Sequence, residues 1–415
     1  MNLKLTKRER DWILYDVGNS AFTMLVATII PLYFNYLAGL GGLSDVEYLA
    51  FWGYASSAAT LVVALLGPVF GTLADTKGYK KPIFTTALLT GAIACVCLGF
   101  LRQWMAFLII FVITKIAYSG SLIFYDSMLS DVTDADRMDH VSSQGYAWGY
   151  IGSCIPFGAC ILVVLNSERL GLSMENAMCI AFVIVAIWWI AMSVPLLRGY
   201  RQTHYVEKQQ HAFRESFLRI KRTFTDIKSH KKIFLFLLAF FFYIDGVYTI
   251  IDMATAYGSA LGLDSTGLLL ALLVTQIVAF PFCILFGRLA QKIKTSTLIM
   301  TCIIAYVGIA VFALFLSTQL HFWILAVLVG MFQGGIQALS RSYFTKLIPA
   351  EQSGEYFGLL DICGKGAAFM GTAIVSFVSQ LTGDINKGVG MITILFLIGL
   401  VLFIRCIRMP DEKVQ

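Results

Sequence analysis

Long apolar runs occupy nearly the whole of this 415-residue chain, and only short polar stretches separate them. Each run has roughly 20 residues or more, enough for a helix rising 1.5 Å per residue to cross a hydrocarbon core of about 30 Å. Only 13% of the residues are charged, against about 25% in an ordinary globular domain. The pattern predicts an all-α integral membrane protein with 12 transmembrane helices near 12–38, 46–70, 82–101, 104–130, 142–165, 174–197, 233–261, 265–287, 296–317, 321–345, 354–380 and 388–408.

Two other interpretations of these runs are disfavoured. A large soluble helical protein would need polar helix faces or longer polar segments between its buried helices, and this chain has only short loops there. A cleaved signal peptide is disfavoured because the first run is too long and contains Asp16 and Asn19.

Basic residues are distributed unevenly between the two sets of loops. If the N-terminus is cytoplasmic, the loops on the opposite side hold only Arg102, Arg169 and Lys387. The positive-inside rule then predicts a multi-pass protein of the cell membrane with both termini in the cytoplasm. Because this asymmetry accounts for the net charge of +6, we expect no nucleic-acid partner. The 9 Cys residues show no metal-site spacing, so we expect neither a metal nor a cofactor.

A basic segment divides the chain into two halves. Residues 198–232 separate six spans from six, which predicts a bundle over 1–197, a cytoplasmic linker over 198–232 and a second bundle over 233–415. Apolar residues recur in the linker at helical spacing, which predicts an amphipathic helix with a basic face on the inner membrane surface. These apolar residues are Phe213, Phe217, Ile220, Phe224 and Ile227.

The loop between the second and third spans carries the motif G-x-x-x-D-x-x-G-x-K-K. It begins at Gly71, a residue type that lets two helices approach closely. Its Asp75 can cap a helix start or pair with a cation on a neighbouring helix. Soluble proteins often have such residues in turns, but at this place in a polytopic protein the motif points to a secondary transporter. We expect a gating set made of Gly71, Asp75, Gly78, Lys80, Lys81 and Arg341.

The second half repeats part of this pattern. Gly287-Arg-Leu-Ala-Gln291 follows Pro281, as Gly71-Thr-Leu-Ala-Asp75 follows Pro68. Parallel six-helix repeats joined by a cytoplasmic linker resemble the major facilitator fold, in which substrate binds near the bilayer midplane between the halves and one half rocks against the other.

Polar and charged side chains within the spans are the candidate substrate and proton sites. A charge at the bilayer centre costs about 2.5–3.5 kcal/mol on insertion scales, so each of them should face a cavity or a partner. The candidates are Asp16, Asn19, Lys115, Asp126, Asp245, Tyr248, Thr249, Asp252, Gln333, Gln337, Asp361 and Lys365.

Depth in the membrane separates these residues into groups. Counted along the helices, Lys115, Asp245 and Lys365 lie roughly 15–18 Å from the span ends, near the midplane. Asp16, Asp126 and Arg341 lie nearer the inner ends, where we expect gating pairs. Asp252 lies further out and suits an outer gate.

Different roles remain open for several of these charges. Asp361 and Lys365 are four residues apart and can simply neutralise each other on one helix. Asp16 can be a solvated acid at a helix start. Asp245 has no cation on its own helix, so burial would favour its binding a proton, and it is our first choice for a coupling site. Lys115 and Lys365, from different halves, can together hold a carboxylate.

Three blocks of sequence resemble the vacuole-effluxer-like branch of the major facilitator superfamily. They are Arg10-Asp-Trp-Ile-Leu-Tyr-Asp16-Val-Gly-Asn19-Ser-Ala-Phe22, Phe242-Tyr-Ile-Asp245-Gly, and Gly334-Gly-Ile-Gln337-Ala-Leu-Ser-Arg341-Ser. The chain departs from that pattern at Phe124-Tyr125-Asp126, where Phe-Tyr-Asn is expected. The resemblance implies export of small solutes, amino acids among them.

These observations predict a transporter and not an enzyme. No ATP-binding or hydrolase motif is present in the sequence. We expect a monomer, in contact with membrane lipids, that moves a small polar solute by alternating access coupled to a proton. Two alternatives remain: a lipid or amphiphile transporter on the same fold, and a membrane sensor that binds solute without moving it.

Overall fold

The computed structural model describes residues 4–207, 230–260, 262–383 and 385–410. Within these ranges it leaves out the side chains at 45, 46, 49, 252, 255, 256, 259, 260, 265, 266, 269, 367–369, 385 and 386. The described part is helical apart from turns, loops and one isolated bridge between Thr76 and Val206. It contains 12 helical stretches that are long and apolar enough to cross a membrane, which confirms the predicted number of spans.

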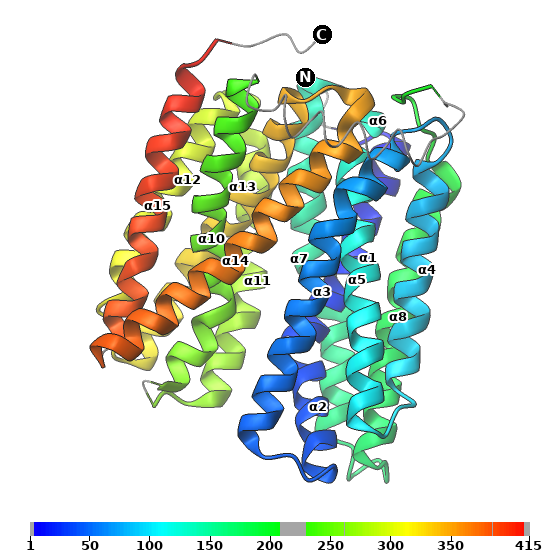
Figure 1. Cartoon of the computed structure of the whole chain (residues 1–415), viewed down its shortest axis with the longest axis vertical. Coiled ribbons are helices and arrows are strands. Elements are labelled where there is room, and N and C mark those ends of the chain that lie inside the picture. Colours follow the sequence, from blue (N-terminus) through cyan, green and yellow to red (C-terminus); the bar gives the residue numbers. More distant parts are fainter. Residues whose placement is uncertain (1–3, 208–229, 261, 384, 411–415) are drawn as a thin grey trace.

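The helices form two bundles, which confirms the predicted fold (Figure 1). The first bundle contains α1 (Lys7–Ala27), α2 (Ile29–Leu40), α3 (Asp45–Ala74), α4 (Lys80–Leu98), α5 (Trp104–Ser127), α6 (Leu129–Val132), η1 (Ala135–Arg137), α7 (Met138–Leu165) and α8 (Met174–Gly199). The second contains α10 (Lys231–Ala260), α11 (Ser265–Leu289), α12 (Thr295–Ala313), α13 (Gln319–Leu347), η2 (Ala350–Gln352), α14 (Ser353–Thr382) and α15 (Ile385–Arg408).

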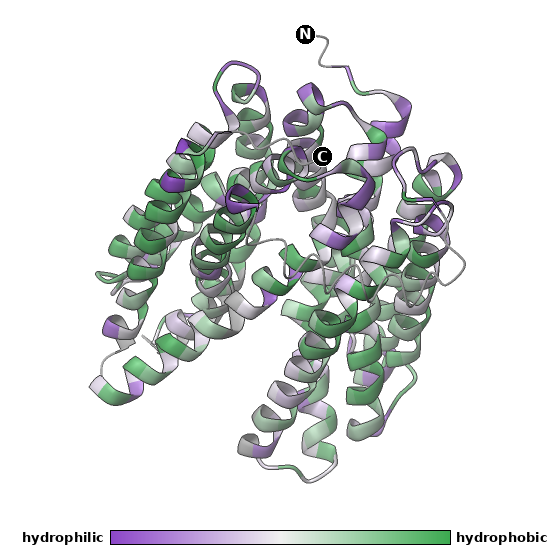
Figure 2. Cartoon of the chain, turned by 45° about the horizontal axis from the view of Figure 1, so that its top comes forward, coloured by the Kyte–Doolittle hydropathy of each residue, from purple (hydrophilic) through white to green (hydrophobic). Residues whose placement is uncertain are grey.

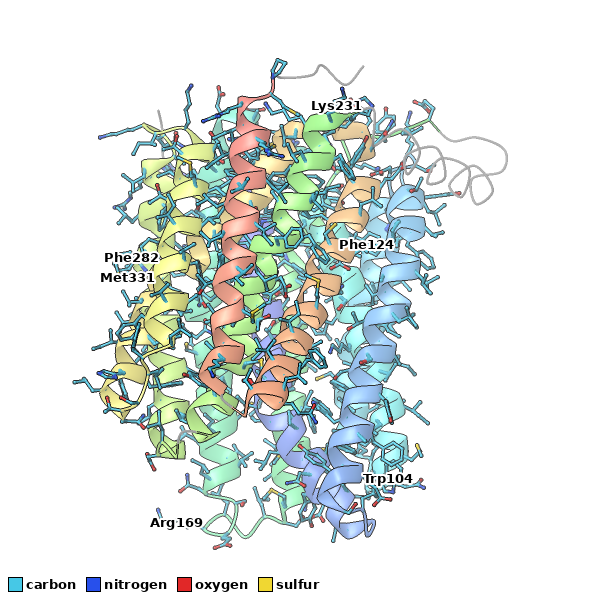
Figure 3. All side chains as sticks on the ribbon, turned by 60° about the vertical axis from the view of Figure 1, so that its left-hand side comes forward. Trp104, Phe124, Arg169, Lys231, Phe282 and Met331 are labelled. Carbon is cyan, nitrogen blue, oxygen red and sulfur yellow. The ribbon has the colours of Figure 1, made fainter. Side chains whose placement is uncertain are left out.

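Both termini lie at one end of the molecule, which we call the terminal end (Figure 1). The two bundles meet there and diverge toward the opposite end, which we call the open end. Hydrophilic residues gather at the two ends, while the flanks of the bundles are mostly hydrophobic (Figure 2). Trp104 and Arg169 mark the open end, Lys231 marks the terminal end, and Phe282 and Met331 lie on the flank between them (Figure 3). This distribution suits a protein surrounded by lipid.

The first span is divided into two helices. α1 begins with a capping box, in which Thr6 and Glu9 each accept a hydrogen bond from the other's backbone amide. It ends at Ala27 because Pro31 has no N–H to donate to the carbonyl group of Ala27 and clashes with that group. The span then continues as α2 after Thr28. Asp16 lies in α1, before this break.

The beginning of the predicted linker packs against the first bundle at the terminal end. The amide of Val206 donates to the carbonyl oxygen of Asp75 at 2.8 Å. The amide of Lys77 donates to the carbonyl oxygen of Val206 at 3.0 Å. The amide of Gly78, where φ is +79°, donates to the side chain of Gln202. The predicted amphipathic helix falls within 208–229, outside the described residues.

Candidate functional site

A single arginine joins the two bundles near the terminal end. Arg341 of α13 donates through Nη1 to Asp126 of α5 at 2.8 Å and through Nη2 to Asp16 of α1 at 3.3 Å. Its Nε and Nη2 also donate to the hydroxyl and carbonyl oxygens of Ser142 on α7. One cation from the second bundle therefore binds three helices of the first, and the three residues predicted to form gating pairs lie together.

Aromatic rings enclose this arginine. The guanidinium carbon lies 4.7 Å from the ring centroid of Trp12, 5.6 Å from that of Tyr125 and 4.3 Å from that of Tyr146. Trp12 and Tyr125 are stacked on each other with centroids 4.4 Å apart, and both are fully buried. Cation–π contacts of this kind strengthen when the cation is desolvated, and Arg341 is only 4% exposed.

The loop motif that begins at Gly71 corresponds to a tight seam between α3 and α14. A Cβ added at Gly71 would overlap with the carbonyl oxygen of Gly354, so only glycine fits this close approach. One turn later, Asp75 accepts the amides of Gly354 and Glu355 at 2.8 and 2.9 Å. The carboxylate thereby caps the N-terminus of α14, where the helix dipole favours a negative charge.

Lys80 lies beneath this cap and is fully buried. Its Nζ is 3.6 Å from Asp75 and 3.8 Å from Asp131, and it donates to Ser353 of α14 at 2.9 Å. The second lysine of the motif, Lys81, is partly exposed beside it. The motif therefore binds the second bundle through both a carboxylate and an ammonium group.

A second seam, which sequence reasoning missed, joins α7 to the second bundle. Asp139 accepts hydrogen bonds from Ser342 of α13 at 2.6 Å, Thr295 of α12 at 2.7 Å and Lys346 of α13 at 2.6 Å. Close by, a Cβ at Gly287 of α11 would lie 2.7 Å from the Cβ of Ser143. Gly287 belongs to the second copy of the loop motif, so the two seams are related as the two halves of the chain are.

A signal for the second seam exists in the sequence. The segments Ala135-Asp-Arg137 and Ala350-Glu-Gln352 each form a 3₁₀ turn directly before a long helix. Asp139 occupies the second position of its helix, as Gly354 does in α14. Aligning the two halves at this turn would have indicated that the start of α7 meets the second bundle as the start of α14 meets the first.

A buried carboxylate connects the beginning of the predicted linker to Lys80 of the loop motif. Asp131 accepts the hydroxyl of Tyr200 at 2.5 Å and the amides of Thr203 and His204 at 3.0 and 2.8 Å. Burial tends to raise the pKa of Asp131, but hydrogen bonds to His204 and Tyr200 and the charge of Lys80 outweigh it and lower the pKa to about 2. The hydrogen bond to Asp131 in turn raises the pKa of His204, against the opposing effect of burial.

A cavity of about 250 Å³ lies between the bundles, next to Arg341. Its polar wall contains two acids and two bases, Asp126, Arg341, Asp361 and Lys365. Its remaining wall is largely aromatic and apolar, with Tyr118, Tyr146, Phe240, Ile244, Tyr248, Phe357 and Leu360. Ser119 and Gln337 add neutral polar groups. The structure thus gathers charged and aromatic groups from α5, α7, α10, α13 and α14 around one space, which we call the central cavity.

The lysines do not form the clamp that the sequence suggested. Lys365 and Asp361 form an ion pair along α14, the arrangement in which the two neutralise each other. Lys115 shares a face of α5 with Ser119 and Asp126, but its Nζ lies toward the open end, 5.9 Å from the ring centroid of Phe111. In this conformation Lys365 therefore lines the central cavity and Lys115 does not.

Other predicted residues lie around the cavity without lining it. Asn19 donates to Asp16 at 3.4 Å and is buried, so it holds the carboxylate that Arg341 binds. Gln333 is buried beside a small separate pocket between α10, α11 and α13. The side chain of Asp252 lies outside the described part of the chain.

Asp245 is fully buried between α10 and α14. Its Oδ1 accepts the amide of Gly371 at 2.9 Å and the hydroxyl of Thr249 at 3.3 Å. Its Oδ2 is buried and has no hydrogen-bond partner among the described residues. Neither Asp245 nor Thr249 lines the central cavity, which α10 meets through Phe240, Ile244 and Tyr248 instead.

Solved structures with this architecture are transporters. The chain superimposes on the human organic anion transporter MFSD10 (TETRAN) with a TM-score of 0.72 at 15% identity, covering 96% of this chain and 100% of that one. It superimposes on the Escherichia coli fucose:proton symporter FucP with a TM-score of 0.70 at 14% identity, covering 96% and 97%. At these identities the likeness concerns the fold, which is that of the major facilitator superfamily.

Sequence relatives identify the branch. A family model described as "Vacuole effluxer Atg22 like" matches residues 39–412. The chain belongs to this family. It is 42% identical over 407 residues to the MFS-type transporter YxiO of Bacillus subtilis, covering 97% of this chain and 95% of YxiO. This vacuole effluxer-like chain is also 24% identical to Autophagy-related protein 22-1 of Aspergillus niger, over 64% of its own length and 46% of that protein. It is therefore a transporter of the major facilitator superfamily, not an enzyme.

Proposed function

We propose that the protein moves a small zwitterionic or carboxylate-bearing solute, of the amino-acid class, through the central cavity. The observation that carries this proposal is the composition of the cavity wall. Lys365 and Arg341 supply cations for a carboxylate, Asp126 and Asp361 supply acceptors for an ammonium group, and all four lie around a space of about 250 Å³. The aromatic side chains of the opposite wall suit an apolar side chain.

Such a solute would compete for groups that already pair with each other. A carboxylate that binds Lys365 weakens its ion pair with Asp361, and an ammonium group that binds Asp126 weakens its contact with Arg341. Loss of the second contact removes part of the connection between the bundles. Binding at the cavity thereby favours opening of the terminal end. The solute would bind the state with an open terminal end more tightly than the closed state, and alternating access requires such a difference in affinity.

Asp245 is the proposed site of proton coupling. When ionised, the carboxylate holds the amide of Gly371 in the middle of α14. Protonation weakens that bond, since a neutral carboxyl oxygen is a poorer acceptor than a charged one. The same α14 forms the seam with α3 at its N-terminus. A proton at Asp245 would therefore loosen the helix that closes the terminal end.

The terminal end is proposed to face the cytoplasm, in the plasma membrane of a bacterial cell. Its loops carry most of the Lys and Arg residues, and the positive-inside rule assigns such loops to the cytoplasm. The structure then corresponds to an outward-facing state, with its inner end closed. Export of solute is supported by the vacuole effluxer-like family.

A lipid or amphiphile is the second candidate cargo. An apolar cavity of about 510 Å³ lies between α3, α4 and α5, and Ile123 lines both this cavity and the central one. We call this apolar cavity the lateral cavity. An acyl chain in it would be separated from the charged groups of the central cavity by the side chain of Ile123. This juxtaposition is the specific observation that favours the alternative.

Ligand binding to the purified protein tests the proposal. Thermal unfolding is followed with amino acids, short peptides, sugars and organic acids at two pH values. Amino acids or organic acids should raise the unfolding temperature, and Lys365→Ala should abolish the increase while Lys387→Ala, on the exposed surface, should not. A shift with amphiphiles alone would favour the lateral cavity. No shift with any polar solute would refute the proposed cargo.

A further inference from the structure

A side cavity within the second bundle lies directly behind Asp245. It has a volume of about 230 Å³ and is bounded by α10, α12, α13, α14 and α15. Its wall includes Tyr257, near the end of α10, and Val389, near the start of α15. These helix ends lie at the open end of the molecule (Figure 1). The cavity therefore lies between Asp245 and the open end.

The two cavities meet different faces of α10. Phe240, Ile244 and Tyr248, spaced by four residues, line the central cavity. Thr249 and Met253, also four residues apart, line the side cavity. Asp245 precedes Thr249 by four residues, so it lies on the face of α10 that the side cavity meets. Its carboxylate is thus one hydrogen bond from the side cavity, through Thr249.

Three hydroxyl groups lie on the cavity wall near Asp245, and one of them, that of Thr249, bonds to the carboxylate. Ser376 of α14 is exposed and lines the cavity. Ser379, on the same helix, has a buried Oγ with no hydrogen-bond partner among the described residues. Thr249 is fully buried and donates to Asp245. The rest of the wall is mostly apolar, and the volume suffices for several water molecules. Water in this cavity would bind at the hydroxyl groups of Thr249, Ser376 and Ser379, which offer it the two or more partners that it needs.

The surroundings of Asp245 contain few charges that could bind the proton instead. On α14 it contacts the amide of Gly371. The nearest charges on that helix, Asp361 and Lys365, pair with each other. Against α15, Phe396 packs on Gly246 beside it. No ion pair involves Asp245 within the described residues, and Asp252 of α10 has a side chain outside them.

We propose that protons from the open end reach Asp245 through this side cavity and Thr249, by a route separate from the central cavity. Hydronium in the side cavity gives a proton to Oγ of Thr249 while the hydroxyl proton of Thr249 passes to Oδ1 of Asp245. The products are a neutral carboxyl group and water, and Thr249 keeps one proton throughout. Proton and solute then enter by different paths, so the solute in the central cavity does not block the coupling site. The route rests on the coupling role proposed for Asp245.

Infrared spectroscopy of the full-length protein in lipid tests the route without a known solute. A pH change should produce a carboxyl C=O band that disappears in Asp245→Asn, and D₂O should shift this band as the proton exchanges. Thr249→Val removes the hydroxyl with nearly unchanged volume, and Ser376→Leu narrows the cavity. Each should slow the exchange, Thr249→Val by about a hundredfold, the lower end of what a positioned proton-transfer group contributes.

One further variant separates the possible outcomes. Gly364→Leu narrows the central cavity, where a Cβ has room, and should leave the exchange rate of the band unchanged. Slower exchange in Gly364→Leu, or unchanged exchange in both Thr249→Val and Ser376→Leu, would overturn the separate route. Absence of the band from the unmodified protein would instead refute Asp245 as the coupling site, and Na⁺-dependent changes in its place would assign the site to a metal cation.

Discussion

Arg341 of the second bundle and Asp126 of the first form an ion pair at 2.8 Å in which the arginine side chain is only 4% exposed. The pair connects the wall of the central cavity to the contacts that close the terminal end, because Arg341 also binds Asp16 and Ser142. Under the proposed function, a solute group that reaches Asp126 would act directly on the contacts of Arg341 at the terminal end. The chain needs no long-range pathway between its cavity and this closure.

Arg341→Ala should open the terminal end. The substitution leaves Asp16 buried and Asp126 half-buried without their cation. Breaking a fully buried ion pair costs about 3–5 kcal/mol, so the cost here should lie toward the lower end of that range. The population should shift toward the inward-open state, measured as faster thiol labelling of Ser142→Cys in the variant background. Arg288→Ala, on the exposed face of α11, is the control and should leave labelling unchanged. Equal labelling in both variants would remove Arg341 from the gate.

Gly71→Ala should hinder closure of the same end. Its Cβ would overlap with Gly354, and overpacking of this kind costs about 1–3 kcal/mol. Gly53→Ala is a matched control on the same helix, since its Cβ meets nothing within 4 Å, and it should be neutral or slightly stabilising. Thiol accessibility at the α3–α14 seam distinguishes the two variants, and a Gly71→Ala protein that closes normally would contradict the seam.

Asp75→Asn should slow transport more than it weakens solute binding. The asparagine can accept only one of the two amides at the start of α14, and a lost charge-assisted hydrogen bond costs about 1.5–3 kcal/mol. The central cavity is untouched, so the solute dissociation constant should stay close to that of the unmodified protein while turnover falls about tenfold or more. Asp264→Asn, at the start of α11 near the open end, is the control. Weaker binding with unchanged turnover would refute a gating role.

The linker should detach from the gate as the pH rises. The hydrogen bond to Asp131 raises the pKa of His204 in the folded protein. The contribution of the His204–Asp131 pair to the free energy of unfolding is therefore complete below the unfolded pKa of about 6.5. It is lost as the pH rises through the folded pKa. The unfolding temperature of the unmodified protein should exceed that of His204→Gln at pH 6, and this difference should shrink by pH 8. His321→Gln, on α13 near the open end, is the control for the loss of a histidine. A difference that grows with pH would contradict the ion pair.

The spans and the fold could be predicted because a lipid environment restricts the secondary structures that a chain can form. Backbone groups must be satisfied within helices there, so runs of apolar residues such as 174–197 indicate their helices directly. The depth of Asp16, Asp126 and Arg341 along their spans also predicted that they would lie together, and the structure joins them. The break before α2 has a signal in Pro31, which the hydropathy pattern does not use.

Contacts between distant polar loops could not be predicted in the same way. Asp139 binds Lys346, which lies 207 residues further along the chain, and no periodicity relates the two. The sequence leaves two roles open for Lys365, a shared anion site with Lys115 and a pair with Asp361, and the structure shows the pair with Asp361, one turn away. Local pairing of this kind competes with pairing between bundles, and the sequence alone does not decide between them.

The central claim is tested most directly in proteoliposomes, by exchange and accumulation of the solute that stabilises the protein in the thermal-unfolding measurement. The unmodified protein should exchange labelled for unlabelled solute and should accumulate it against its gradient when a pH gradient is imposed. Asp245→Asn should still exchange at fixed pH but should no longer accumulate. A protein that binds the solute without exchanging it would be a sensor and not a carrier, and an Asp245→Asn variant that still accumulates solute would contradict proton coupling at this residue.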